Sequence, residues 1–133
     1  MPTLFADSWY YIELLDRRSA SHTQAVEYLK GRRARIVTTA WVLTEVAAHF
    51  SRAKTRHLFV GLTELLNNDA DTVVVPANAD LFNLGTTMYR DRPDKDWSLV
   101  DCISFVIMGR QALYEALTAD HHFRQAGFVP LFT

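Results

Sequence analysis

The sequence predicts an α/β sandwich built on a mainly parallel sheet, and two observations carry this prediction. Short apolar runs alternate along the chain with longer amphipathic runs, which is typical of repeated strand–helix units. The clearest short run, Thr72-Val73-Val74-Val75 before Pro76, is β-branched throughout, as many strands are. In folds of this class the working site lies at the carboxyl ends of the strands.

The first half of the chain supplies two strands and four helices. The run Leu4-Phe5-Ala6 predicts a buried strand, and residues 34–38 predict a second one. Gly31 is a plausible stop for the helix that precedes this second strand. Apolar residues that recur with helical spacing predict amphipathic helices. The four expected helices cover residues 8–16, 21–30, about 40–50 and about 58–66.

The second half continues the alternation after the strand at 72–75. Gly85 weakens the helix expected over 79–89, and a charged loop follows at 90–96. The most apolar helix is then expected at 98–108. Gly127 ends a short helix that begins at His121, and Pro130 favours an edge position for the last strand. The remaining expected elements are a strand at 115–119, a helix at 121–126 and a strand at 128–132.

Length and composition indicate one domain over residues 1–133. Of these residues 49% are hydrophobic and 22% charged, which is ordinary for a globular protein and excludes a disordered or collagen-like chain. No run reaches the ~18 apolar residues of a membrane span. The first residues lack the basic start of a signal peptide, and the single Cys102 suits a reducing compartment. We therefore expect a cytoplasmic protein without a membrane partner.

The formal net charge of -1 hides a strong asymmetry along the chain. Residues 17–56 contain nine Lys and Arg against two Asp and Glu, which gives +7. The other residues contain five against thirteen, which gives -8. This split predicts a basic face that could meet a polyanion, although solvated helix faces explain it about equally well.

Several common sites are missing from the sequence. It contains no phosphate-binding glycine loop, no Gly-x-Gly-x-x-Gly pattern and no paired-cysteine zinc pattern. Two of the five histidines, His121 and His122, are adjacent and the others are scattered. We interpret all five as solvated or core histidines rather than as functional ones.

Three aspartates stand at places where a helix begins. Asp7 and Asp120 each follow an expected strand and precede an expected helix, so taken alone each is best explained as a helix N-cap. Asp101 is the only charge in the apolar run from Ser98 to Gly109, where a lone buried carboxylate costs several kcal/mol. Ser98 and Asp101 resemble a capping box, which accounts for only part of the coordination capacity of that carboxylate.

Glu45 has no capping role, because it lies about two turns inside its expected helix, and a solvated helix face is its default interpretation. In the predicted fold, however, Asp7, Glu45, Asp101 and Asp120 can converge at one carboxyl edge of the sheet. Carboxylates so placed repel one another, and a divalent cation removes that repulsion. Ligation by oxygen alone suits Mg²⁺ or Mn²⁺.

Four segments in this order resemble a PIN domain, and specifically a VapC-type toxin of a toxin–antitoxin pair. Each segment is weakly specific alone, but together they span essentially the whole chain. They are Phe5-Ala6-Asp7-Ser8, Thr38-Thr39-Ala40-Trp41-Val42-Leu43-Thr44-Glu45, Asp96-Trp97-Ser98-Leu99-Val100-Asp101-Cys102, and Leu117-Thr118-Ala119-Asp120-His121-His122-Phe123 with Ala126-Gly127-Phe128. The third acid of the family is often followed by Ala, where this chain has Cys102.

The resemblance implies a three-layer α/β/α sandwich with a mainly parallel five-stranded sheet. It also implies a Mg²⁺-dependent (or Mn²⁺-dependent) endoribonuclease, in which a metal-activated water attacks a phosphodiester and leaves a 5′-phosphate and a 3′-hydroxyl. The metal ligands and catalytic residues would be Asp7, Glu45, Asp101 and Asp120. Supporting roles fall to Ser8 and Thr118. Asp96 is interpreted first as a loop residue and second as an extra acid near the metal.

RNA phosphates would be bound by the basic segment, and the residues expected to do so are Arg17, Arg18, Arg52, Lys54 and Arg56. VapC-type toxins favour structured targets such as tRNA anticodon loops or ribosomal RNA loops. The family also implies a homodimer and inhibition by a VapB-type antitoxin that inserts a segment into the site.

Two other enzyme classes do not fit the sequence. A haloacid-dehalogenase-type phosphatase needs a second Asp at position 9, which is Trp9. A response-regulator receiver needs a late Lys, but the last lysine is Lys95. The open alternative is a non-catalytic PIN-like module that binds protein or RNA.

Overall fold

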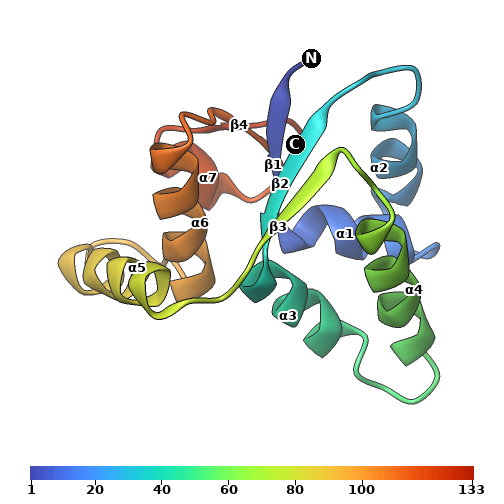
Figure 1. Cartoon of the computed structure of the whole chain (residues 1–133), viewed down its shortest axis with the longest axis horizontal. Helices are drawn as coiled ribbons and strands as arrows, with labels where there is room; N and C mark the ends of the chain where they lie inside the picture. The colour runs from blue at the N-terminus through green and yellow to red at the C-terminus, as the bar shows by residue number, and fades with distance from the viewer.

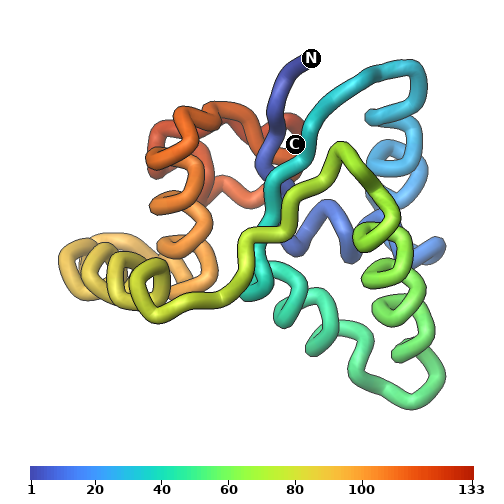
Figure 2. Tube along the Cα trace, viewed as in Figure 1, coloured from blue at the N-terminus to red at the C-terminus, as the bar shows by residue number.

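Five strands form one sheet in the order β3-β2-β1-β4-β5, and every neighbouring pair is parallel. The strands of this computed structural model, which describes residues 1–133, are β1 (Thr3–Ala6), β2 (Arg35–Thr39), β3 (Thr72–Val75), β4 (Glu115–Leu117) and β5 (Val129–Pro130). In Figure 2 the blue, cyan and lime strands run in one direction, so their carboxyl ends meet at one edge. The predicted α/β class and parallel sheet are confirmed.

Seven helices cover the two faces of the sheet, as Figure 1 shows. One layer contains α1 (Ser8–Leu15), α2 (His22–Tyr28), α3 (Ala40–His49) and α4 (Arg56–Asn67). The other contains α5 (Ala79–Asp91), α6 (Leu99–Arg110) and α7 (His121–Gln125). The sandwich therefore has the three layers that the resemblance implied. No helix is long and apolar enough to cross a membrane.

The element boundaries match the predicted pattern closely, with two differences in the last third. Gly31 and Gly127, the two expected helix stops, both have left-handed φ values of 71° and 94°. The fourth strand ends at Leu117 rather than Ala119, because the backbone N–H of Thr118 turns back to the Ala116 carbonyl at 3.0 Å and does not pair with a neighbouring strand. The last strand contains only Val129 and Pro130, and lies at an edge as Pro130 predicted.

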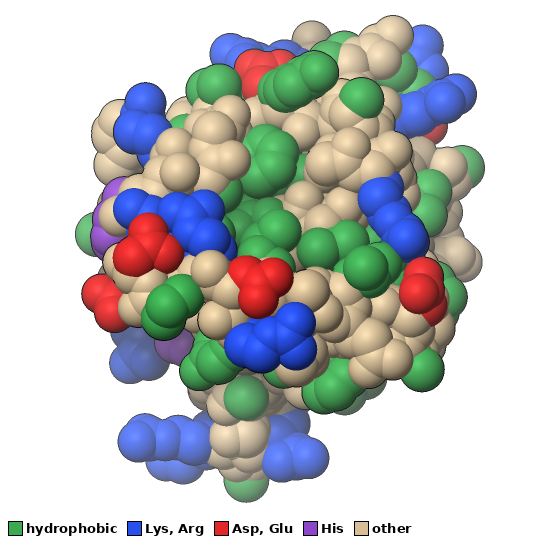
Figure 3. Space-filling model, turned by 90° about the vertical axis from the view of Figure 1, so that its left-hand side faces the viewer, with side chains coloured by type: hydrophobic (Ala, Val, Ile, Leu, Met, Phe, Trp, Pro, Cys, Tyr) green, Lys and Arg blue, Asp and Glu red, His purple; other side chains and the backbone are tan.

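The α5–α6 pair packs closely because Gly85 has no side chain. A Cβ at Gly85 would collide with the side chain of Ile103 on α6 and would lie 3.3 Å from its Cα. Residues of α5, α6 and α7 and of the segments beside them line an apolar groove of about 540 Å³, and Trp97 and Phe105 are among them. Figure 3 views the layer and shows apolar side chains near its centre with charged ones around them.

The core lies on both sides of the central strands. Phe5 and Leu117, from β1 and β4, are fully buried, as are Val42 and Val46 of α3. Helix α6 is buried over most of its circumference, as its apolar sequence predicted. The central strands and α6 are therefore well packed, and the residues at their ends are attached to buried segments.

Candidate functional site

Four acidic side chains are delivered to the carboxyl edge of the sheet by four different elements. Asp7 directly follows β1, and Asp120 follows β4 by three residues. Glu45 lies in the middle of α3, which follows β2, and Asp101 lies in the first turn of α6. Their charges act on one another: Asp101 and Glu45 raise the pKa of Asp7, and Asp120 raises the pKa of both Glu45 and Asp101. The structure therefore brings the four predicted acids together.

Asp7 is the most buried of the four, with 5% of its surface exposed. Burial raises its pKa to about 7, and the charges of Asp101 and Glu45 add to that rise. Hydrogen bonds from the Thr118 hydroxyl and the Ser8 backbone act in the opposite direction. The Thr118 hydroxyl donates to Oδ2 of Asp7 at 2.9 Å.

The N-cap interpretation of Asp7 is wrong. Asp7 occupies the N-cap position of α1 with extended backbone, but its side chain accepts no hydrogen bond as a cap of that helix. Its Oδ2 instead accepts the hydroxyl of Thr118. The burial of Asp7 therefore serves something other than helix capping.

Asp101 and Ser98 form the expected capping box at the start of α6. The Ser98 hydroxyl accepts the Asp101 backbone N–H at 3.0 Å, and Oδ2 of Asp101 accepts the Ser98 N–H at 3.1 Å. Burial raises the pKa of Asp101 and the charge of Asp120 adds to it, whereas the Ser98 N–H and His122 lower it. Capping uses Oδ2 of this carboxylate.

Asp120 is a true helix cap. Its Oδ1 accepts the His122 backbone N–H at 2.9 Å at the start of α7. Its own backbone N–H donates to the Thr118 hydroxyl at 3.1 Å. Thr118 thus connects Asp120 to Asp7, since the same hydroxyl donates to Asp7. Asp120 therefore caps α7 and also lies at the acidic site.

Glu45 is half-buried and does not face open solvent as a surface helix residue would. Burial raises its pKa, the Ser8 side chain lowers it by hydrogen bonding, and the charges of Asp101 and Asp120 raise it further. Ser8 therefore contacts two of the acids, Asp7 through its backbone and Glu45 through its side chain.

His122 lies at the acidic cluster, where the sequence interpretation did not place it. Its Nδ1 lies 3.1 Å from Oδ2 of Asp101 and 3.4 Å from Oδ1 of Asp120, so one ring nitrogen bridges two acids. The side chain is only 20% exposed, whereas that of the adjacent His121 is 73% exposed. The available signal was its spacing: the second residue after an aspartate cap donates to that cap, which brings its ring toward the site.

The two threonines at the end of β2 hold the strand ends in place. The Thr38 hydroxyl donates to the Ala6 carbonyl at 2.9 Å, one residue before Asp7. The Thr39 hydroxyl accepts the Val42 N–H at 3.1 Å and caps α3, the helix that carries Glu45. Both side chains are fully buried.

Asp96 lies apart from this cluster in the contacts it makes. It is exposed in the loop between α5 and α6, and its carboxylate forms no hydrogen bond or ion pair. Its first interpretation, as a loop residue, agrees with this placement.

The residues present fit a divalent cation. No Lys or Arg pairs with Asp7, Glu45, Asp101 or Asp120; the ion pairs at the site involve only His121 and His122. Buried carboxylates without a cationic partner are costly, and the raised pKa values report that cost. Carboxylate oxygens are the donors that Mg²⁺ and Mn²⁺ prefer.

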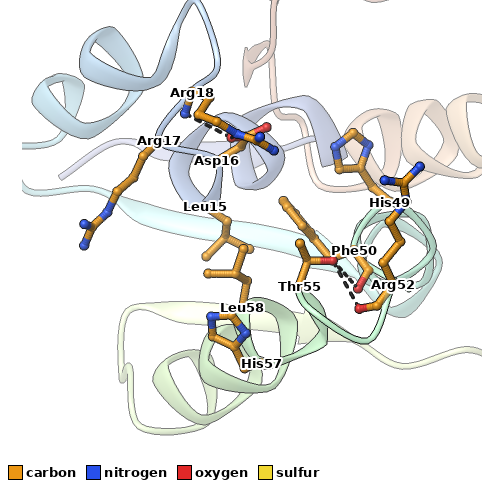
Figure 4. A pocket seen from close by; sticks show the side chains of 10 residues that line it. All are labelled: Leu15, Asp16, Arg17, Arg18, His49, Phe50, Arg52, Thr55, His57 and Leu58. Carbon is orange, nitrogen blue, oxygen red and sulfur yellow. Dashed lines mark hydrogen bonds and ion pairs between the residues drawn. The ribbon is translucent and has the colours of Figure 1, made fainter.

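A second feature, which we call the basic cleft, lies between the end of α1, the end of α3 and the start of α4 (Figure 4). It has a volume of about 760 Å³. Its charged and aromatic lining comes from two segments, residues 15–18 and 49–58, and three of the five predicted RNA-binding residues are among them. These three are Arg17, Arg18 and Arg52.

The other two predicted RNA-binding residues, Lys54 and Arg56, do not line the basic cleft. Both are exposed. One guanidinium nitrogen of Arg56 donates to the Ser51 carbonyl at 2.8 Å, within the loop between α3 and α4.

Solved structures with the same fold extend over nearly the whole chain. VapC20 of Mycobacterium tuberculosis, a toxin that cleaves the sarcin–ricin loop, has a TM-score of 0.87 at 22% identity, covering 96% of this chain and 98% of its own. VapBC2 of Rickettsia felis, bound to a promoter DNA fragment, has a TM-score of 0.67 at 10% identity, covering 98% and 97%. FitAcB of Neisseria gonorrhoeae has a TM-score of 0.63 at 14% identity, covering 100% and 97%.

No protein-family model and no curated protein sequence matches the chain. At these identities the comparisons concern the fold. The chain has the PIN-like α/β/α fold of VapC-type toxins, and the predicted resemblance is confirmed at that level.

Proposed function

We propose that this chain is a Mg²⁺-dependent endoribonuclease of the VapC type that cleaves structured RNA. The observation that carries the proposal is the set of four acids at the carboxyl edge of a PIN-like sheet, three of them with raised pKa values and none paired with Lys or Arg. Such a set is unfavourable by itself and becomes favourable when it holds a divalent cation.

In this proposal Asp7, Glu45, Asp101 and Asp120 hold Mg²⁺ or Mn²⁺. When bound, the metal would polarise a phosphoryl oxygen and lower the pKa of water for attack on the phosphodiester. The chain's own residues then have positioning roles. Thr118 orients Asp7 and Asp120 through one hydroxyl, and Ser8 contacts Asp7 and Glu45.

In this proposal His122 does not bind the metal but orients two of the carboxylates that do, Asp101 and Asp120. Its Nδ1 lies within 3.4 Å of both Asp101 and Asp120, and it restricts how far the two can separate. Residues that hold ligands in this way contribute substantially to metal affinity.

The substrate class and the protein partner follow the fold neighbours. VapC20 is a toxin that cleaves the sarcin–ricin loop, a structured ribosomal RNA, so we take ribosomal or transfer RNA as the substrate class. The name VapBC2 pairs a VapB protein with a VapC protein, and we propose a VapB-type antitoxin for this chain as well. We also propose a homodimer, which rests on the family resemblance alone.

Brief induction of the chain in bacterial cells, followed by mapping of new RNA 5′ ends, tests the proposal. We expect a small number of sharp new ends in tRNA or ribosomal RNA, and their loss when the neighbouring gene is co-expressed. The Asp7→Asn variant, at equal protein level, is the control for cleavage by host enzymes. A purified chain that binds RNA but never cuts it would instead favour a non-catalytic PIN-like binding module.

A further inference from the structure

We propose that the basic cleft is a phosphate-binding subsite that holds single-stranded RNA beside the acidic cluster. The inference rests on the proposed function, and it adds which residues bind the strand and on which side of the acids it lies. The basic cleft is lined by three arginines and two histidines, His49 and His57, against one carboxylate, Asp16. Its electrostatic sign is therefore opposite to that of the acidic cluster.

Two of the three arginines are free to bind a ligand. Arg17 and Arg52 are exposed and form no ion pair with any carboxylate of the chain. Arg18 is different, because its backbone N–H donates to Oδ1 of Asp16 at 3.0 Å and its Nε lies 3.8 Å from the same oxygen. The net charge available to a phosphate therefore comes mainly from Arg17 and Arg52.

The loop that carries Arg52 is ordered by its own hydrogen bonds. The Thr55 hydroxyl donates to the Phe50 carbonyl at 3.1 Å and lies 3.3 Å from the Arg52 carbonyl, as the dashed lines in Figure 4 mark. That carbonyl also accepts the backbone N–H groups of Thr55 and Arg56, each at 3.0 Å. A loop fixed in this way loses little further entropy when Arg52 binds.

Two helices lead from the acidic cluster to the basic cleft. On α3, His49 follows Glu45 by one turn, so the two side chains share a face. On α1, Ser8 contacts the acids at one end and Leu15 lines the basic cleft at the other, about 10 Å along the axis at 1.5 Å per residue. The helices α1 and α3 pack against each other, so a strand that leaves the acidic cluster along their surface reaches the arginines within a short run of nucleotides.

The apolar part of the lining favours a nucleic acid over an acidic protein segment. Leu15, Phe50 and Leu58 lie between the charged groups, and the ring of His49 packs edge-on against Phe50 at 4.8 Å. Proteins that bind single strands combine positive charge along the backbone with flat side chains against the bases. The basic cleft offers the positive charge, and its flat exposed side chains are those of His49 and His57, because Phe50 is buried.

Binding of a labelled ten-nucleotide single-stranded RNA to the full chain, measured in EDTA over a range of salt, tests the inference without cleavage. The test variant is Arg17→Ala with Arg52→Ala. The matched control is Arg33→Ala with Arg35→Ala, which removes two exposed arginines of the same basic segment at the opposite, amino-terminal end of β2. We expect the test variant to bind about tenfold or more weakly, and its salt slope to fall by about 1.4, or 0.7 per lost phosphate contact.

The control should keep the wild-type slope and affinity within about twofold. Equal losses in both variants would overturn the inference, because they would mean unspecific attraction by surface charge. Unchanged binding by the test variant would also overturn it. Binding of a polyglutamate peptide is measured in the same way. If the peptide binds more weakly to the test variant and RNA does not, the basic cleft belongs to an acidic protein segment.

This experiment separates the inference from the proposed function. If the wild type binds RNA through Arg17 and Arg52 but does not cleave it with Mg²⁺, the subsite stands and the nuclease proposal fails. If cleavage is metal-dependent but neither arginine affects binding, the nuclease proposal stands and the subsite fails. Thermal unfolding of all variants should show wild-type melting temperatures, because the four substituted arginines are exposed.

Discussion

The Thr118 hydroxyl donates a hydrogen bond to Oδ2 of Asp7 at 2.9 Å and so joins the ends of two neighbouring strands, β1 and β4. The Thr118 hydroxyl oxygen also accepts the backbone N–H of Asp120 at 3.1 Å. One fully buried hydroxyl therefore orients two acids that are more than a hundred residues apart in the chain. Because Asp7 is itself buried, this contact reduces the cost of its charge.

Replacement of Thr118 by Val should destabilise the protein at pH 8. The substitution keeps the shape of the side chain. It leaves the Asp7 carboxylate without the hydroxyl donor and the Asp120 backbone N–H without an acceptor. We expect the free energy of unfolding in urea to fall by about 1–3 kcal/mol. Thr118→Ser keeps the hydroxyl and should lose clearly less. Equal losses in the two variants would mean that the missing methyl or general packing matters, not the hydrogen bond.

Stability without metal should fall as pH rises from 4 to 7. Folding raises the pKa of Asp7 from 3.8 to about 7. Between these values the unfolded chain releases the proton while the folded chain keeps it, so each step up in pH favours unfolding, and the effect ends above pH 7. Because of Asp7 alone, the free energy of unfolding should fall by about 2–3 kcal/mol between pH 5 and pH 8.

Asp7→Asn provides the control for that pH dependence, because it removes the charge and keeps an oxygen that can accept from Thr118. Urea unfolding in EDTA should show a flatter pH profile than the wild type and greater stability at pH 8. Saturating Mg²⁺ should stabilise the wild type at pH 8 more than the variant. Parallel pH profiles for the two proteins would contradict the raised pKa of Asp7.

Asp120→Ala should behave differently from Asp7→Asn. Asp120 caps α7 through the His122 N–H, whereas Asp7 caps nothing. Loss of a cap costs about 1 kcal/mol, which opposes any gain from reduced charge repulsion. We therefore expect Asp120→Ala to leave metal-free thermal stability unchanged or lower. A gain as large as that of Asp7→Asn would show that repulsion, not capping, dominates at Asp120.

His122→Ala should weaken binding of Mn²⁺ measured by calorimetry. His122 holds Asp101 and Asp120 together through Nδ1, and loss of such an outer partner typically lowers metal affinity by about 10–100-fold. His121→Ala is the comparison, since that ring is mostly exposed and 3.6 Å from Asp120. Its effect should be several-fold smaller. Equal effects would mean that both histidines hold the metal site to the same degree.

Much of the fold and the acidic cluster followed from local sequence patterns. Alternating apolar runs predicted the parallel sheet, and strand ends followed by Asp7 and Asp120 predicted their common edge. The apolar circumference of α6 predicted the burial of Asp101. These succeeded because strand and helix periodicity determine which residues are buried and where each strand ends.

Contacts between distant residues could not be predicted in the same way. Nothing local distinguishes Asp7 from Asp120 as a cap, since the difference lies in Thr118, which is far away in the chain. The sequence led to the interpretation of His122 as a solvated or core histidine, because its contact with Asp101 depends on how α6 and α7 pack together. The division of the basic segment into arginines that line a cleft and arginines that do not also depends on packing.

The most direct measurement of the central claim is the rate at which the purified chain cleaves a synthetic sarcin–ricin loop or anticodon hairpin, with Mg²⁺ and with EDTA, beside Glu45→Gln. We predict cleavage only with Mg²⁺, products that carry a 5′-phosphate, and a rate at least about 100-fold lower for Glu45→Gln, whose melting temperature in EDTA should be no lower than that of the wild type. Equal cleavage in EDTA, or a Glu45→Gln variant as fast as the wild type, would contradict the claim that these acids hold the metal that drives the reaction.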